Sequence, residues 1–454
     1  MPSFARVALI SLTLVLLLVD AGLVLWRVRH AYFVSIPPLQ YITVIWGVIT
    51  GFVALVSAAA PGYRILKTAI TGQESEHKQI SVDRVILMLA NAVVAPLRRP
   101  SVALPTLVAL AGLAVVLVWY PDPPKSPRTS SGVLAVTVGH EKLIYVADPE
   151  HGQILVFRSS DLTKPFTTIP IGSHGNVGGR GKPENMIELR RGRLHLIFVT
   201  DIASDKVHIV DRDSNTVVEP SLAVGKVPKS LAVTPDGRKL FVGNEQPIPN
   251  GTISVFDVSG DEPKDFRLLS TINGVNCPEG ITLSPGGDQL YVSTQCGGGK
   301  DPVFIIDTAK MAVVGSIPGL AVGTSVSVSP DGDWLYVGRG NQPCVDPDTK
   351  ERGSPLSIVD VRKRQIAKTV CLRTSVGAIA VSRDLEGRYL LVANGTRLSI
   401  FDREGIARDA ASLNDIPLEA GVAGMSVADD NSVYAFLPTT RRLFVASPTG
   451  LTAE

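Results

Sequence analysis

The chain has 454 residues and a formal net charge of +2, from 44 basic and 42 acidic side chains. Charges this close to balance exclude a general electrostatic attraction to nucleic acid. The length exceeds what one ordinary hydrophobic core occupies. Apolar residues make up 45% of the chain and are densest in its N-terminal quarter, which predicts a separate N-terminal region.

Three apolar runs account for this density, at residues 7–26, 41–60 and 102–119, and only the first contains a charged residue, Asp20. Each is long enough to cross a bilayer as a helix. Aromatic residues suited to the membrane interface flank the runs: Trp26, Tyr41, Trp119 and Tyr120. The sequence therefore predicts a region 1–120 with three transmembrane helices. Buried soluble helices, or a cleavable signal peptide for the first run, are the alternatives.

Basic residues predict the orientation of this region. Residues 61–101, between the second and third runs, contain six of them, and the segment between the first two runs contains two. The longer segment is therefore expected in the cytoplasm, with the N-terminus inside and the remainder of the chain outside. Residues 82–95 are apolar but too short to span, which favours an interfacial helix or a re-entrant segment. Residues 121–131 contain four prolines and predict an extended spacer.

From residue 132 onward one pattern occurs seven times: a polar turn, an apolar strand, and a second apolar strand that ends in a polar residue. The clearest copies are Thr234 to Glu245, Ser284 to Gln295 and Ser329 to Gly340. The strand centres recur every 43 to 55 residues, at Tyr145, Phe198, Phe241, Tyr291, Tyr336, Leu391 and Tyr434. This period, with several short strands in each unit, is typical of a β-propeller.

Turn chemistry supports the repeat. Proline followed by Asp-Gly fixes φ and then allows a positive φ, so the chain reverses tightly between two strands. A β-branched strand further along ends in aspartate in five units, at Asp211, Asp257, Asp307, Asp360 and Asp402. These carboxylates are expected to accept backbone N–H bonds in the following turn.

The units resemble the YVTN type of β-propeller repeat, with Leu290-Tyr-Val-Ser293 and Leu335-Tyr-Val-Gly338 as the nearest matches. The resemblance implies an all-β, seven-bladed propeller over residues 132–454. After Ala446 there is little room for a fourth strand in the last unit. Either residues 133–138 supply that strand, or the last blade has three strands.

All four cysteines lie within the repeats. In a propeller blade the start of the first strand, the end of the second and the end of the fourth share one face, here called the loop-rich face. Cys277 precedes a first strand and Cys296 follows the second strand of the same unit. Cys344 follows a second strand, and Cys371 is near the end of that unit's fourth strand. The sequence therefore predicts the pairs Cys277–Cys296 and Cys344–Cys371 in an oxidising compartment. Free buried thiols are the alternative.

The loop-rich face also carries the longest loops, and loops held by a rigid frame often bind ligands. Its candidate ligand-binding residues are His174, Arg180, Lys182, Glu184, Lys229, Glu245, Glu279, Lys300, Asp301 and Arg339. Glu184 and Glu279 with Asn185 would offer oxygen ligands to a divalent cation. Since the equivalent positions in other units are Lys229, Ser325, Gly377 and Gly424, Lys229 is expected to neutralise one acid. The sequence predicts no metal, no cofactor and no catalytic residue.

These observations favour a membrane-anchored, extracytoplasmic propeller that binds or scaffolds at the cell envelope. Its expected partners are the bilayer and an envelope protein or polysaccharide, and nucleic acid is not among them. A propeller enzyme of lactonase or lyase type, with its site at the channel mouth, is the alternative, because propellers carry both kinds of function. A third possibility is a sensor whose membrane region transmits to a partner.

Overall fold

The chain divides into two units, Met1–Asp122 and Pro123–Glu454. The computed structural model describes residues 131–172, 181–245, 251–296, 302–320, 323–340, 343–346, 350–383, 387–406 and 412–446, all in the second unit. The expected transmembrane runs, the segments 61–101 and 82–95 and most of the 121–131 spacer lie outside the described residues. Within the described part of the chain, no helix is long and apolar enough to cross a membrane.

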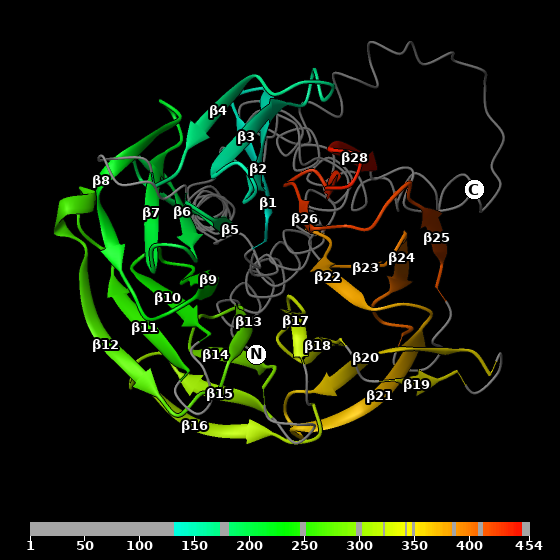
Figure 1. Ribbon diagram of the computed structural model, residues 1–454. Helices are drawn as coiled ribbons and strands as arrows, with labels where there is room; N and C mark the ends of the chain where they lie inside the picture. Colours follow the sequence, from blue (N-terminus) through cyan, green and yellow to red (C-terminus); the bar gives the residue numbers. More distant parts are fainter. Residues whose placement is uncertain are drawn as a thin grey trace, which may run out of the picture. The chain divides into compact units, whose positions relative to one another are not determined.

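The second unit consists of seven antiparallel sheets arranged around a centre (Figure 1). Blade 1 contains β1 (Val133–Val138), β2 (Glu141–Asp148), β3 (Gln153–Arg158) and β4 (Thr167–Pro170). Blade 2 contains β5 (Pro183–Arg191), β6 (Leu194–Asp201), β7 (Lys206–Asp211) and β8 (Thr216–Ala223). Blade 3 contains β9 (Pro228–Val233), β10 (Lys239–Asn244), β11 (Thr252–Asp257), the 3₁₀ turn η1 (Pro263–Asp265) and β12 (Arg267–Asn273).

The remaining blades follow in chain order. Blade 4 contains β13 (Pro278–Leu283), β14 (Gln289–Thr294), β15 (Val303–Asp307) and β16 (Ala312–Ile317). Blade 5 contains β17 (Gly323–Val328), β18 (Trp334–Arg339), the short β19 (Cys344–Val345), β20 (Arg352–Asp360) and β21 (Gln365–Leu372). Blade 6 contains β22 (Val376–Val381), β23 (Tyr389–Asn394), β24 (Arg397–Asp402) and β25 (Asn414–Pro417). Blade 7 contains β26 (Gly424–Val427), β27 (Val433–Leu437) and β28 (Arg442–Ala446).

This architecture confirms the seven-bladed β-propeller that the repeat predicts. Seven hydrophobic clusters hold it together, and each lies between two neighbouring blades. The central residues of the second strands, such as Tyr145, Phe241 and Tyr336, are buried in these clusters. Because every blade packs against the next, apolar burial stabilises the ring as a whole.

The expected turn chemistry is present. Gly237, Gly287 and Gly332 follow the prolines of the three clearest repeats, and all have positive φ. Each of the five aspartates that end third strands accepts a backbone N–H bond from the next turn, for example from Ser214 to Asp211 at 2.7 Å. The residues that recur from unit to unit are therefore those that end strands and form turns.

The polar residue that ends the second strand is also structural. Asp148, Asp201, Asn244, Thr294 and Asn394 are all buried, at 0 to 5% exposure. Each hydrogen-bonds to the start of its own blade's third strand or the turn before it; Asn244 Nδ2, for example, donates to Thr252 Oγ1 and Ser254 Oγ. These side chains satisfy backbone and hydroxyl groups where the second and third strands diverge.

Ring closure follows the second of the two predicted alternatives. Residues 133–138 form the innermost strand of blade 1, and blade 7 has three strands among the described residues. Blades 7 and 1 are joined by side chains: Lys142 Nζ lies 2.5 Å from Asp430 Oδ2, and Arg441 Nη2 donates to Asp148 Oδ2 at 2.9 Å. Ser131 Oγ accepts the Met425 N–H at 3.0 Å. Polar contacts therefore supplement the apolar cluster between these two blades.

Candidate channel-mouth site

A β-bulge recurs at the start of the inner strands, where they reach the loop-rich face. In blades 2 to 6 the pairing of the first and second strands shifts immediately after the first residue of the inner strand. Bulges re-aim side chains out of a regular ladder. The residues skipped by the pairing are Glu184 with Asn185, Lys229, Glu279, Thr324 and Gly377. In blade 5 the residue skipped by the pairing is Thr324, one position before Ser325, which the sequence comparison had placed there.

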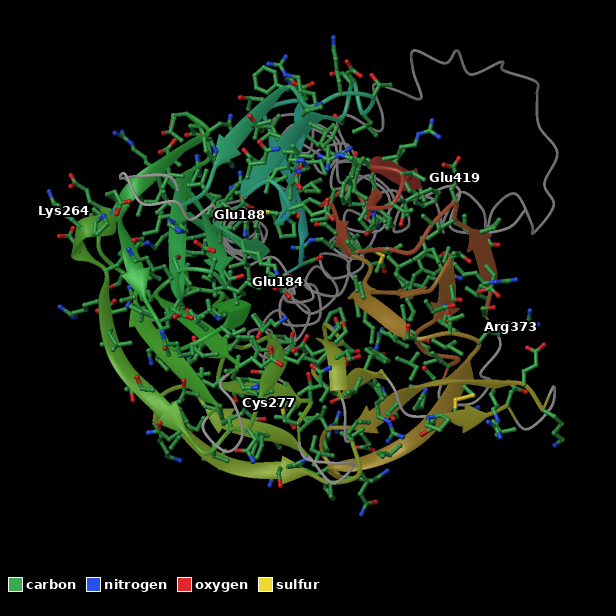
Figure 2. The ribbon with its side chains drawn as sticks, viewed as in Figure 1. Glu184, Glu188, Lys264, Cys277, Arg373 and Glu419 are labelled. Carbon is green, nitrogen blue, oxygen red and sulfur yellow. A yellow bond between two sulfur atoms is a disulfide. The ribbon has the colours of Figure 1, made fainter. Side chains whose placement is uncertain are left out.

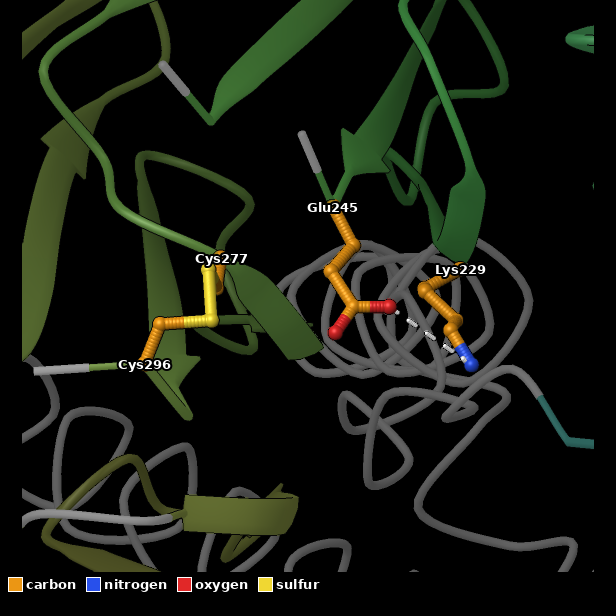
Figure 3. Close-up of a disulfide and its surroundings, with 4 residues drawn as sticks. All are labelled: Lys229, Glu245, Cys277 and Cys296. Carbon is orange, nitrogen blue, oxygen red and sulfur yellow. Dashed lines mark ion pairs between the residues drawn. A yellow bond between two sulfur atoms is a disulfide. The ribbon is translucent and has the colours of Figure 1, made fainter. Parts of the chain in front are cut away.

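Three of these bulges bring charged side chains together. Lys229 Nζ lies 2.8 Å from Glu184 Oε1 and 3.7 Å from Glu245 Oε2, which follows β10. All three side chains are half-buried, at 19 to 31% exposure. Figure 3 shows Lys229 and Glu245 facing each other beside the Cys277–Cys296 disulfide, and Figure 2 places Glu184 near the centre of the ring. The prediction that Lys229 neutralises an acid at this position is confirmed.

Glu279 belongs to the same cluster as Glu184, Lys229 and Glu245 through its electrostatic interactions with them. Burial raises the pKa of its carboxyl to about 7, and the negative charges of Glu245 and Glu184 act in the same direction, whereas the charge of Lys229 opposes the rise. Its Oε2 is buried and has no hydrogen-bond partner among the described residues. Near neutral pH this carboxyl is therefore poised between its two protonation states.

Lys229 responds to the same surroundings. Burial alone would lower the pKa of its ammonium group. The hydrogen bond and charge of Glu184, with the charges of Glu279 and Glu245, more than offset burial and raise that pKa. Lys229 is therefore held as a cation among three carboxyl groups, and the cluster carries more acid than base.

The Asn185 side chain does not point freely into the channel mouth, because its Nδ2 donates to Lys229 O at 2.6 Å. This bond orients the amide toward the backbone of blade 3. No group of three or more histidine, cysteine, aspartate or glutamate side chains among the described residues is arranged to hold a metal ion. What the site does offer is hydrogen-bond acceptors around one fixed cation.

The other predicted residues have different positions. The Lys182 side chain is exposed, and its backbone N–H donates to buried Asp201. Arg339 Nη1 donates to Gly319 O at 2.7 Å, and burial lowers the pKa of its guanidinium group. His174, Arg180, Lys300 and Asp301 lie outside the described residues.

Both predicted disulfides are present. Cys277 and Cys296 have Cα atoms 5.6 Å apart, and Cys344 and Cys371 have theirs 5.8 Å apart. The first ties the start of β13 to the end of β14, next to Glu279. The second ties β19 to the end of β21, the outer strand of blade 5. There is no free cysteine, since all four cysteines of the chain are paired.

The sequence did not predict that His208 and Asp201 form a buried pair. His208 Nε2 lies 3.2 Å from Asp201 Oδ2, and Ser204 Oγ donates to the same carboxylate at 2.6 Å. Asp201 is fully buried, and its bonds to His208 and Ser204 and to the backbone hold its pKa well below its usual range despite burial. His208 lies in β7 between buried Val207 and Ile209, and its role here is structural. The polar end of β6 was the signal that could have identified its partner.

Comparisons with known proteins agree with this architecture. No protein-family model matches the chain. The seven-bladed β-propeller protein Rv1057 of Mycobacterium tuberculosis is 30% identical over 163 residues, which are 34% of this chain and 39% of that protein. Antigen Lp49 of Leptospira interrogans is 22% identical over 146 residues, or 31% of this chain and 30% of the antigen. The chain thus spans less than two fifths of the length of either relative.

Solved structures show the same fold at low sequence identity. A chain of hydrazine synthase from Kuenenia stuttgartiensis superposes with a TM-score of 0.56 and 16% identity, covering 68% of this chain and 93% of that one. A chain of a mitotic checkpoint complex superposes with a TM-score of 0.50 and 14% identity, covering 72% and 92%. The fold is a seven-bladed β-propeller. At these identities the likeness concerns architecture alone.

Proposed function

We propose that the chain is a binding module of the cell envelope, anchored by its N-terminal region, with a YVTN-type propeller outside the cytoplasm. Two disulfides support an oxidising location, because such bonds rarely persist in the cytosol. The three apolar runs and the basic residues between the second and third support the anchor and its orientation. Asn244 and Asn394 occupy the last position of the motif after which the repeat is named, where both are buried and hydrogen-bonded.

The channel-mouth cluster carries the proposal. Glu184, Lys229 and Glu279 occupy bulges in three successive blades, and Lys229 contacts Glu184 and also Glu245 at the end of β10. Glu279 interacts electrostatically with the other three. A partly desolvated set of carboxyl groups favours a partner that presents hydrogen-bond donors or a positive charge. Glu184 and Glu245 keep 31% and 26% of their side chains exposed, so their oxygens provide accessible acceptors for such a donor. The neighbouring disulfide restrains the chain that positions Glu279 beneath them in the same cluster.

Photo-crosslinking in intact cells tests this proposal. A photoreactive residue replaces exposed Lys182 on the loop-rich face or, as the control, exposed Arg238 in the turn between β9 and β10 on the opposite face. We expect a discrete crosslinked envelope partner from position 182 and none from position 238. Adding Glu245→Gln should reduce the yield at position 182. Equal crosslinking from both positions, or a yield that Glu245→Gln leaves unchanged, would contradict the proposal.

A further inference from the structure

A concave surface lies at the periphery of the ring, apart from the residues of the channel mouth. It is a groove of about 630 Å³ between β4, the outer strand of blade 1, and the turn that joins β7 to β8 in blade 2. Both walls belong to the periphery of the ring, where β4 and β8 are neighbours (Figure 1). The groove is lined by Phe166, Thr167, Thr168, Ile169, Pro170, Asp213, Ser214, Asn215, Thr216 and Val217. Its volume is in the range of small-molecule binding sites.

The wall from blade 2 is held in one conformation. Asp211 Oδ1 accepts both the backbone N–H and the hydroxyl of Ser214, at 2.7 and 2.9 Å. The buried Tyr145 hydroxyl donates to Asn215 Oδ1 at 2.7 Å. Because this bond uses the amide oxygen, the Asn215 NH₂ group remains as the donor available to a ligand.

Asp213 is fixed in the same wall. Its Oδ1 accepts from Arg212 Nη2 at 2.9 Å, and its Oδ2 lies 3.1 Å from His195 Nδ1. The Arg212 hydrogen bond lowers the pKa of Asp213, although its side chain remains 58% exposed. Its charge is already partnered, so the carboxylate serves as an oriented acceptor and does not require a cationic ligand.

The wall from blade 1 adds a hydroxyl and an aromatic ring. Thr167 pairs with Val156 on the face of β4 that is turned toward blade 2, and its hydroxyl makes no hydrogen bond within the described part of the chain. Phe166 is 51% exposed, and the Arg158 guanidinium lies 3.9 Å from its ring centroid. One face of the ring is thereby covered by a cation, which fixes the ring, and the remaining ring surface lines the groove.

We propose that this groove binds a neutral oligosaccharide. Hydroxyl, amide and carboxylate groups match the alternating donors and acceptors of sugar hydroxyls, and an exposed aromatic ring packs against the apolar C–H face of a sugar ring. The lining contains no lysine or arginine, which disfavours phosphorylated or acidic ligands. An extended peptide fits less well, because β4 has four residues and ends in Pro170, which has no N–H to donate.

Saturation-transfer NMR and calorimetric titration of the full chain, in a detergent without a sugar headgroup, test the proposal. The probes are trisaccharides of glucose, mannose and N-acetylglucosamine. We expect saturable binding of at least one probe. Phe166→Ala should weaken that binding about tenfold, and Thr167→Val should weaken it severalfold by removing one hydroxyl at constant shape. Phe166 is exposed and Thr167 is partly exposed, so the melting temperature should stay close to the wild-type value.

Two control variants complete the design. Leu268→Ala removes an equally exposed apolar side chain, 52% exposed on β12, and should bind sugar like the wild type. Glu279→Gln, at the channel mouth, should also leave sugar binding unchanged, which separates this site from the proposed envelope-binding function. The proposal fails if no probe saturates, or if Phe166→Ala and Thr167→Val bind as tightly as wild type.

Discussion

Replacing Glu279 by glutamine should change how stability depends on pH. In the folded chain the pKa of this carboxyl is raised from 4.5 to about 7, chiefly by burial. Between these two values the folded state binds more protons than the unfolded state, so the stability contributed by this group falls as pH rises. The loss of stability is absent at pH values below the pKa of the carboxyl in the unfolded state, and it is complete above its pKa in the folded state. Since each pKa unit corresponds to about 1.36 kcal/mol, the full cost is about 3 kcal/mol.

Glutamine has nearly the same shape and cannot ionise, so Glu279→Gln should remove that cost. We expect the variant and the wild type to be equally stable at pH 4, and the variant to be more stable by up to about 3 kcal/mol at pH 8. Urea denaturation across this pH range, followed by β-sheet circular dichroism, measures the difference. Glu262→Gln, at a side chain 60% exposed immediately before η1, is the matched control and should give a curve parallel to wild type. Parallel curves for Glu279→Gln as well would refute the assigned electrostatics of the channel mouth.

Three further changes test the frame by denaturation. Arg441→Met leaves buried Asp148 without its partner from blade 7 and should lower the free energy of unfolding by about 1–3 kcal/mol. Arg442→Met breaks an exposed pair with Glu419 and should lower it by less than about 1 kcal/mol. Equal losses for the two variants would argue against ionic ring closure. Removing the Cys344–Cys371 bridge by a double serine substitution should lower the free energy of unfolding by about 3 kcal/mol, because the bridge closes a loop with a sequence separation of 27 residues. An unchanged midpoint of denaturation would contradict this. Asn244→Ala should cost about 2 kcal/mol by leaving buried Thr252 and Ser254 hydroxyls unsatisfied, and a loss below the error of the fit would disprove that role.

The fold was largely predictable from the sequence because the residues that define its repeat act on nearby positions of the chain. Turn residues such as Gly237 and strand-ending aspartates such as Asp211 act within a few positions of themselves, so their spacing reveals the blades. The disulfide pairs were predictable for a related reason. A blade's meander fixes which strand ends share a face, and all four cysteines occupy such ends.

The site was only partly predictable. Proline before Glu184 and Glu279 marked the start of inner strands, and Lys229 was expected to neutralise an acid. The bulges that select Thr324 over Ser325 depend on register across two strands, which no single strand reveals. Likewise, the ring-closing pairs join Lys142 to Asp430 and Arg441 to Asp148, contacts set by closure of the whole ring. The peripheral groove also joins two blades, so its walls have no common sequence signal.

Binding at the channel mouth is tested most directly by affinity. The envelope partner that crosslinks at position 182 is purified, and its dissociation constant is measured for the wild type, Glu245→Gln and the exposed control Glu262→Gln. Loss of one charge-assisted contact predicts roughly tenfold weaker binding for Glu245→Gln and wild-type affinity for Glu262→Gln. Identical affinities for all three proteins would contradict recognition through the cluster of Glu184, Lys229, Glu245 and Glu279.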